Sequence, residues 1–268
     1  MKIENITTSN WENAFRGMRN PYDSWDKSDS VFGLAPVALK EEILAANTDR
    51  KPEDLIIREE GGCIEYVNIG GKDIDLAQRL ISGGPVHSKF LRQINISMDI
   101  TAPLYVWKEL DTYKVGTVAN SCSTMHTIAN HPITLDCFEI EDFNNLEYPY
   151  TEQRKEAAGF ADQNFVQMHL IPYLEYLRTE YLKYKKLADN TENYVDAATY
   201  VKTAKKYWKE LIRWLPEGWL QKRTWTCNYE VARNILKWRD PHRLTEWIPI
   251  CDALKSLPYA DYLLTYKI

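Results

Sequence analysis

The stretch QINISMDIT at residues 93–101 decides the fold class of this chain. Isoleucine or methionine occupies every second position from Ile94 to Ile100, and polar residues occupy the positions between them. Successive side chains of a strand point to opposite faces, so this alternation predicts a strand with one apolar and one polar face. Ala102 and Pro103 follow directly, and the proline favours the start of a helix that we expect to run to about Tyr113.

The other periodic segments surround this strand mainly with helices. Expected helices cover residues 36–47, 73–81, 151–188, 195–215, 228–239 and 243–257, and further expected strands cover 63–69 and 219–227. Pro172 should kink or interrupt the longest helical stretch. The pattern predicts an α+β fold, with a mixed sheet, flanking helices and a lobe of long helices at about 151–215, in a single domain over residues 1–268.

Composition and charge narrow the classes of function. Hydrophobic residues make up 44% and charged residues 26% of the 268 residues, as in a folded globular chain. The 33 Lys and Arg against 38 Asp and Glu give a net charge of -5, which argues against wrapping long nucleic acid but allows a local basic pocket for a small anion. The sequence has no apolar run long enough for a membrane span, and its five scattered cysteines form no C-x-x-C pair. We therefore expect a cytoplasmic protein that uses neither a membrane nor a metal.

Residues 119–124 form a run of small polar residues with two alternative interpretations. Backbone N–H groups and hydroxyls of such a run can cradle a phosphate, whereas an ordinary polar loop has the same composition. Cys122 and His126 are four residues apart, a spacing that also allows a nucleophilic dyad. Partners in such dyads usually come from distant parts of a chain, so the dyad is the less favoured interpretation.

The expected helix at 228–239 carries the clearest candidate site. Asn228 and Arg239 are close to three helical turns apart, so they lie near one azimuth at a separation of about 16 Å. Asn234 lies between apolar positions and needs hydrogen-bond partners, which the edge of a flat heterocycle would supply. For Arg239 the alternative is a C-terminal arginine that complements the helix dipole.

Two distant segments together resemble the flavin-dependent thymidylate synthase family. The first segment of that family has a histidine, then an amphipathic strand, then Ala-Pro and a helix. The corresponding residues in this chain are His87, residues 94–100, Ala102-Pro103 and residues 104–107. The second segment of that family has Leu-Pro, then a strand, then a helix with two asparagines and an arginine. It corresponds to residues 215–239. The matching positions of that second segment are Leu215, Pro216, Asn228, Asn234 and Arg239, followed by His242 and Glu246.

The resemblance implies an enzyme that methylates dUMP to dTMP, a step of nucleotide biosynthesis. It implies FAD as cofactor, methylenetetrahydrofolate and NADPH (the reduced form of NADP) as co-substrates, and a homotetramer with sites between subunits. By resemblance His87, Asn228 and Asn234 contact the flavin, and Arg239 binds the uracil and is the catalytic residue. A guanidinium suits that role because it stays charged and stabilises an anionic pyrimidine.

The remaining site positions depart from the family pattern. The family's Arg-His-Arg signature is replaced by Thr112, Tyr113 and Lys114, of which we expect Tyr113 and Lys114 to contact the cofactor. By resemblance the expected substrate-binding residues are Glu109, Asn120, Ser121, Cys122, Ser123, Arg213 and Arg239. With several family cations absent, two further hypotheses stay open. One is a family-fold protein that binds flavin or nucleotide without synthase activity or modifies a different pyrimidine, and the other is an unrelated helical interaction protein.

Overall fold

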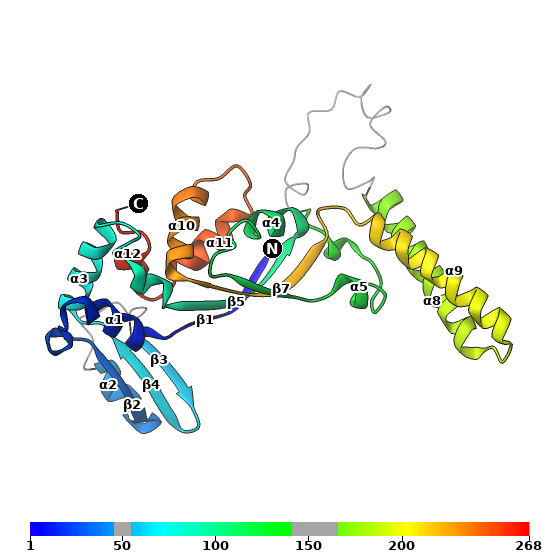
Figure 1. Cartoon of the computed structure of the whole chain (residues 1–268). Helices are drawn as coiled ribbons and strands as arrows, with labels where there is room; N and C mark the ends of the chain where they lie inside the picture. The colour runs from blue at the N-terminus through cyan, green and yellow to red at the C-terminus, as the bar shows by residue number, and fades with distance from the viewer. Residues whose placement is uncertain (46–54, 141–165, 268) are drawn as a thin grey trace. The chain divides into compact units, whose positions relative to one another are not determined.

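The structure is a computed structural model that describes residues 1–45, 55–140 and 166–267 (Figure 1). Its strands are β1 Lys2–Ser9, β2 Val31–Pro36, β3 Ile56–Glu60, β4 Cys63–Asn68, β5 Asn95–Pro103, β6 Val118–Ser121 and β7 Leu220–Asn228. The helices are α1 Trp11–Arg19, α2 Lys40–Ala45, α3 Gly71–Ser82, α4 Leu104–Leu110, α5 Thr124–Thr127, α8 Ile171–Asn190, α9 Tyr194–Arg213, α10 Tyr229–Arg239, α11 Trp247–Lys255 and α12 Ala260–Leu263. Mixed helices and sheets confirm the α+β class. No helix in these described ranges is both long and apolar enough to cross a membrane.

Two sheets form among the described residues. One has the strand order β1-β5-β7-β6 and the other β2-β4-β3. By residue contacts the chain divides into two compact units, which we describe separately. Unit 1 comprises Met1, Thr101–Leu110 and Ser121–Arg223, and unit 2 comprises Lys2–Ile100, Asp111–Asn120 and Thr224–Ile268. The single domain expected from the sequence stays a prediction.

The core of unit 2 contains the alternating apolar residues of the stretch at 93–101. Ile94, Ile96, Met98 and Ile100 are at most 1% exposed, so the predicted strand and its apolar face are confirmed in β5. Burying each such side chain contributes about 1.5–3 kcal/mol. The helix expected after Pro103 begins at Leu104, but it ends at Leu110 and does not reach Tyr113.

The antiparallel sheet of unit 2 corrects one prediction. Pro36 ends strand β2 and does not open a helix. Within the expected helix 36–47, a 3-10 turn covers Val37–Leu39 and α2 covers Lys40–Ala45, and residues 46 and 47 lie outside the described residues. A proline can end a strand at a sheet edge, where its missing N–H removes no ladder bond. Gly61 and Gly62, with φ of 58° and 83°, form the two-residue turn between β3 and β4 that requires positive φ at both positions.

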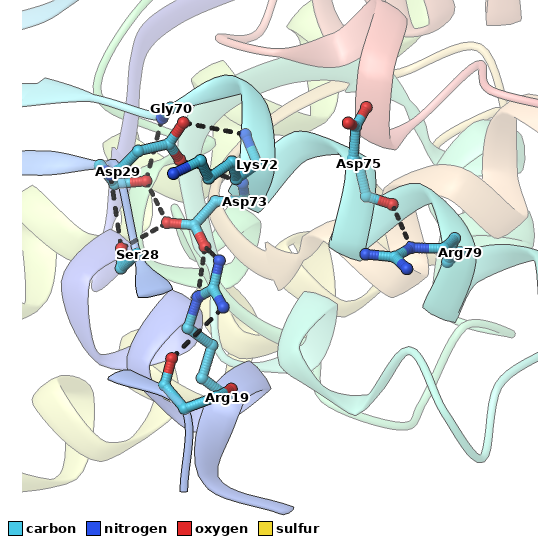
Figure 2. Close-up of polar contacts among 10 residues, drawn as sticks. Arg19, Ser28, Asp29, Gly70, Lys72, Asp73, Asp75 and Arg79 are labelled. Atoms are coloured by element: carbon cyan, nitrogen blue, oxygen red, sulfur yellow. Dashed lines mark hydrogen bonds and ion pairs between the residues drawn. The ribbon is translucent and has the colours of Figure 1, made fainter. Parts of the chain in front are cut away.

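A buried ion pair fixes the start of α3 in unit 2 (Figure 2). The Arg19 guanidinium contacts the Asp73 carboxylate, and the two side chains are 6% and 0% exposed. The hydroxyls of Ser28 and Ser30 donate to the other oxygen of Asp73. Asp29 accepts from the backbone N–H groups of residues 72 and 73, at 2.9 and 3.2 Å, and so caps the helix. The segment before β2, predicted only as turn-rich, is therefore anchored to α3.

Unit 1 contains the two long helices. α8 and α9 are joined by residues 191–193 and pack against each other along their length (Figure 1). Pro172 lies in the first turn of α8, directly after a π-helical turn at Val166–Leu170, so the helical geometry changes where the sequence predicted a kink or interruption. α9 covers most of the helix expected at 195–215. Residues 151–165 of the expected lobe lie outside the described residues. The core of this unit is formed by Ile128, Ile133, Phe138, Leu174, Leu177 and Leu211.

Candidate functional site

A pocket of about 860 Å³ lies in unit 2, where mainly three segments converge, with Ile81 of α3 and Lys267 of the C-terminal segment beside them. The three segments are the connection after α3, the loop that precedes β6, and the exposed side of α10. Its lining residues are Ile81, Gly84, Pro85, Ser88, Arg92, Thr112, Tyr113, Lys114, Val115, Gly116, Asn228, Glu230, Val231, Arg233, Asn234, Lys237 and Lys267. The volume is within the range of small-molecule sites.

The pocket is electropositive. Its cationic lining residues are Arg92, Lys114, Arg233, Lys237 and Lys267, and its one acidic lining residue is Glu230. Arg233 is held by the carbonyls of Leu263 and Leu264, at 3.3 and 2.8 Å, and burial lowers the pKa of its guanidinium although Glu230 acts in the opposite sense. Lys114 forms no side-chain ion pair within the described residues. The charge excess suits an anionic ligand, and Lys114 is one of the cations available to pair with it.

The start of α10 supplies both predicted asparagines. Asn228 is the N-cap of this helix, and its Oδ1 accepts from the Val231 N–H at 3.0 Å. Asn228 is 7% exposed, whereas Asn234 is exposed on the pocket side of the helix. Gly116 has a φ of 77°, and a Cβ there would lie 2.5 Å from the Asn228 amide nitrogen. A glycine is thus required where the loop before β6 meets the helix.

Arg239 is held by aromatic and imidazole side chains at the end of α10. Its Nε donates to the Tyr113 hydroxyl at 3.1 Å, and its Nη1 lies 2.9 Å from His242 Nε2. Its guanidinium carbon lies 4.8 Å from the centre of the buried Trp247 ring. The Thr117 hydroxyl donates to the Tyr113 carbonyl, so Tyr113 is fixed at its ring and at its backbone. Since Lys114 is the next residue, Arg239 positions the loop that carries Lys114.

Arg239 itself does not line this pocket, and the structure places the remaining predicted residues outside it as well. His87 is exposed in the connection after α3, between the lining residues Pro85 and Ser88, but does not line the pocket. Asn120 is exposed in β6. In unit 1, Glu109 lies in α4, and Arg213 is 64% exposed and pairs with Glu210 at 2.5 Å.

The small polar run forms a strand end and a helix start, and its residues from Ser121 onward belong to unit 1. Ser121 ends β6, the Cys122 N–H donates to the Lys222 carbonyl at 2.8 Å, and Ser123 is the N-cap of α5 without a side-chain cap bond. The Cys122 thiol lies 3.9 Å from the Thr127 hydroxyl, and no hydrogen bond between Cys122 and His126 occurs in this part of the structure. The geometry does not assemble the dyad.

Several pocket residues were not identified from the sequence. Glu230, Arg233 and Lys237 lie on α10 at helical spacing with Asn234, and this polar stripe was a signal that could have identified them. Arg92 and Lys267 come from segments far apart in sequence, so only the tertiary fold brings them together.

Comparison with known proteins identifies the class of fold. Two crystal structures of the flavin-dependent thymidylate synthase ThyX from Helicobacter pylori, each with FAD and dUMP, match this chain at a TM-score of 0.53. One is 18% identical and aligns over 99% of this chain and 98% of its own, and the other is 17% identical over 100% of both. This chain therefore has the fold of flavin-dependent thymidylate synthases. No protein-family model matches the sequence, and no curated protein does.

Proposed function

We propose that this chain binds FAD in the pocket of unit 2 and performs a flavin-dependent, folate-linked methylation of a pyrimidine nucleotide, dUMP or a relative. The observation that carries the proposal is the electropositive pocket beside the start of α10, in a chain with this fold. The structural neighbours contain FAD and dUMP, which are both anionic and carry flat heterocycles. In this proposal the chain is a single functional domain and assembles as a homotetramer.

The lining residues fit the phosphates of such ligands. Lys114 and Arg92 supply cationic donors from two different segments, and Lys237 adds a third from α10. Cationic donors form short charge-assisted bonds to phosphate. Asn234 offers both an amide donor and an acceptor to the edge of a heterocycle. Bound flavin would supply the hydride, with methylenetetrahydrofolate and NADPH as co-substrates.

Arg239 is the residue that we assign to the pyrimidine. A guanidinium has five N–H donors and remains protonated, so it stabilises negative charge on the ring without taking part in proton transfer. Tyr113 and His242 fix its orientation, and Trp247 covers one of its faces. We assign the remaining substrate contacts to Glu109, Asn120, Ser121, Cys122, Ser123 and Arg213, and the flavin contact outside the pocket to His87.

The contacts of Arg239 with Tyr113 and His242 also favour a second candidate function. Because Tyr113 and His242 contact the guanidinium, a uracil ring has to displace or share these contacts. A protein that binds flavin or nucleotide in the same pocket without methylating dUMP meets no such requirement, and one that modifies a different pyrimidine meets it only if that ring also contacts Arg239. The two candidates share ligand binding and differ in synthase activity.

Two measurements separate these functions. The flavin absorbance spectrum of the purified protein, titrated with FAD and with dUMP, reports binding, and thymidine-independent growth of a synthase-deficient strain reports activity. Lys114→Ala should weaken binding, whereas Lys202→Ala, at an exposed lysine in α9, is the matched control. Binding with growth supports the synthase, and binding without growth supports the second candidate. If neither ligand binds, both proposals fail.

A further inference from the structure

Strand β2 lies at one edge of the three-stranded sheet of unit 2, and β3 lies at the other. The antiparallel register pairs Pro36 with Cys63, and the Val37 N–H continues it by donating to the Gly62 carbonyl at 3.1 Å. Backbone groups of an antiparallel strand alternate in direction, so residues 33 and 35 bond to β4. Phe32, Leu34 and Pro36 therefore direct their backbone groups away from the sheet. Among the described residues nothing pairs with the N–H groups of Phe32 and Leu34.

The two edges of this sheet differ in charge. β3 reads IIREE and carries Arg58, Glu59 and Glu60, and charged side chains are a usual protection against pairing with another strand. β2 reads VFGLAP and carries no charge. Its Leu34 is 78% exposed and its Val31 47% exposed. An uncharged, exposed edge strand is a template for an added strand.

We propose that β2 pairs with β2 of a second copy of this chain, antiparallel across a two-fold axis. Two uncharged strands meet without like charges facing each other, which a pair of β3 edges could not avoid. Such an interface is isologous, with the same surface on both copies.

One register fits the outward groups of β2. With Leu34 opposite Leu34 of the second copy, the two leucines exchange N–H···O bonds, and the Phe32 N–H meets the Pro36 carbonyl of the other strand. The outward N–H groups of Phe32 and Leu34 thus each gain an acceptor. Pro36, which has no N–H, contributes only its carbonyl oxygen to the pairing. Leu34, Phe32 and Pro36 share one face, so the side chains that meet across the axis are all apolar.

The edge is separate from the pocket of the proposed function, because none of its residues lines that pocket. A six-residue strand pair is smaller than a standard protein interface, so we expect an association that depends on protein concentration in the micromolar range or above. Amide exchange of Phe32 and Leu34 reports this edge alone and is insensitive to association through any other surface.

The test is hydrogen exchange and sedimentation over a dilution series of the full chain, with three variants. Leu34→Pro removes one outward N–H while leaving every bond to β4, and Leu34→Ala keeps the N–H as the matched control. We expect slow exchange at Phe32 and Leu34 only at high concentration. We also expect at least a tenfold weaker association for Leu34→Pro and about threefold or less for Leu34→Ala. Leu34→Lys places a charge on the edge and should also weaken association. This variant keeps the test decisive if the proline variant does not fold.

The proposal fails if these two amides exchange at the same rate at every concentration. It also fails if Leu34→Pro and Leu34→Lys associate as tightly as the parent chain, or if the edge is protected only when a different protein is added. Loss of FAD or dUMP binding has no bearing on these outcomes, so this proposal and the proposed function fail independently.

Discussion

Replacing Arg239 by alanine tests whether this residue supports the pocket. The substitution removes the bond to the Tyr113 hydroxyl, the contact with His242 and the stacking on Trp247. Hydrogen bonds to a charged group contribute about 1.5–3 kcal/mol and a cation–π contact about 0.5–2 kcal/mol. Arg239 is only half-buried, so the lower ends of these ranges apply and the expected loss of unfolding free energy is about 2–3 kcal/mol.

For a chain of this size such a loss lowers the melting temperature by about 4–12 °C. The release of Tyr113 should also weaken FAD or dUMP binding, because Lys114 is no longer held at the pocket. Thermal melting and calorimetric titration measure the two effects. Lys237→Ala, in the same last turn of α10, is the control for stability, and it should lose only about 0.3–1 kcal/mol of helix-dipole interaction.

Two results would refute this reasoning. An unchanged melting temperature would mean that the contacts of Arg239 with Tyr113 and Trp247 do not stabilise unit 2. For FAD, which we do not assign to Arg239, additive losses of affinity in the Arg239→Ala, Lys114→Ala double variant would mean that Arg239 does not act through the loop that carries Lys114.

Three other predictions follow from the described contacts. Lys114→Ala should weaken FAD or dUMP binding by more than about tenfold, or about 1.4 kcal/mol, without lowering the melting temperature, and titration of both ligands checks this. Asp73→Asn should destabilise the chain by about 3–5 kcal/mol in denaturant titrations because it leaves the Arg19 charge buried without its counter-ion, whereas a change below about 1 kcal/mol would contradict the role of this pair. Burial raises the pKa of Glu175, but its bonds from Arg178 and from the backbone N–H of residue 133 outweigh burial and lower it below the usual 4.5. The stability that Glu175 contributes is therefore present above that usual value and is lost as the pH falls through the lower folded-state pKa, and Glu175→Gln should flatten this part of the acid-denaturation curve.

The sequence correctly predicted those elements whose pattern is set locally, by the burial of one face or by a single capping side chain. β5 alternates because one side of it is core, and α10 begins at Asn228 because an asparagine side chain caps a helix by itself. α1 was missed because its buried residues are spread through a polar and aromatic segment that resembles a turn-rich loop. Pro36 was misassigned because a proline suits both a first helical turn and the edge of a sheet, and only the pairing with β4 distinguishes them.

The candidate site was predictable only in part for a related reason. Asn228, Asn234 and Lys114 line one pocket, since they lie on segments whose local pattern is retained, and their contacts with a flavin stay a prediction. The bond between Arg239 and Tyr113 joins residues 126 positions apart, and nothing in local spacing encodes it. Likewise, Arg92 and Lys267 become neighbours of Lys114 only when the whole unit has folded.

The contacts of the C-terminal segment have a consequence for the order in which this protein forms during synthesis. Leu263 and Leu264 are fully buried, their carbonyls hold Arg233, and the Tyr259 hydroxyl accepts from the Ile69 N–H at 2.7 Å. Domains generally fold as units as the chain leaves the ribosome. Unit 2 cannot complete its core until residue 264 has emerged, so the pocket on α10 forms after translation of this segment and not during it.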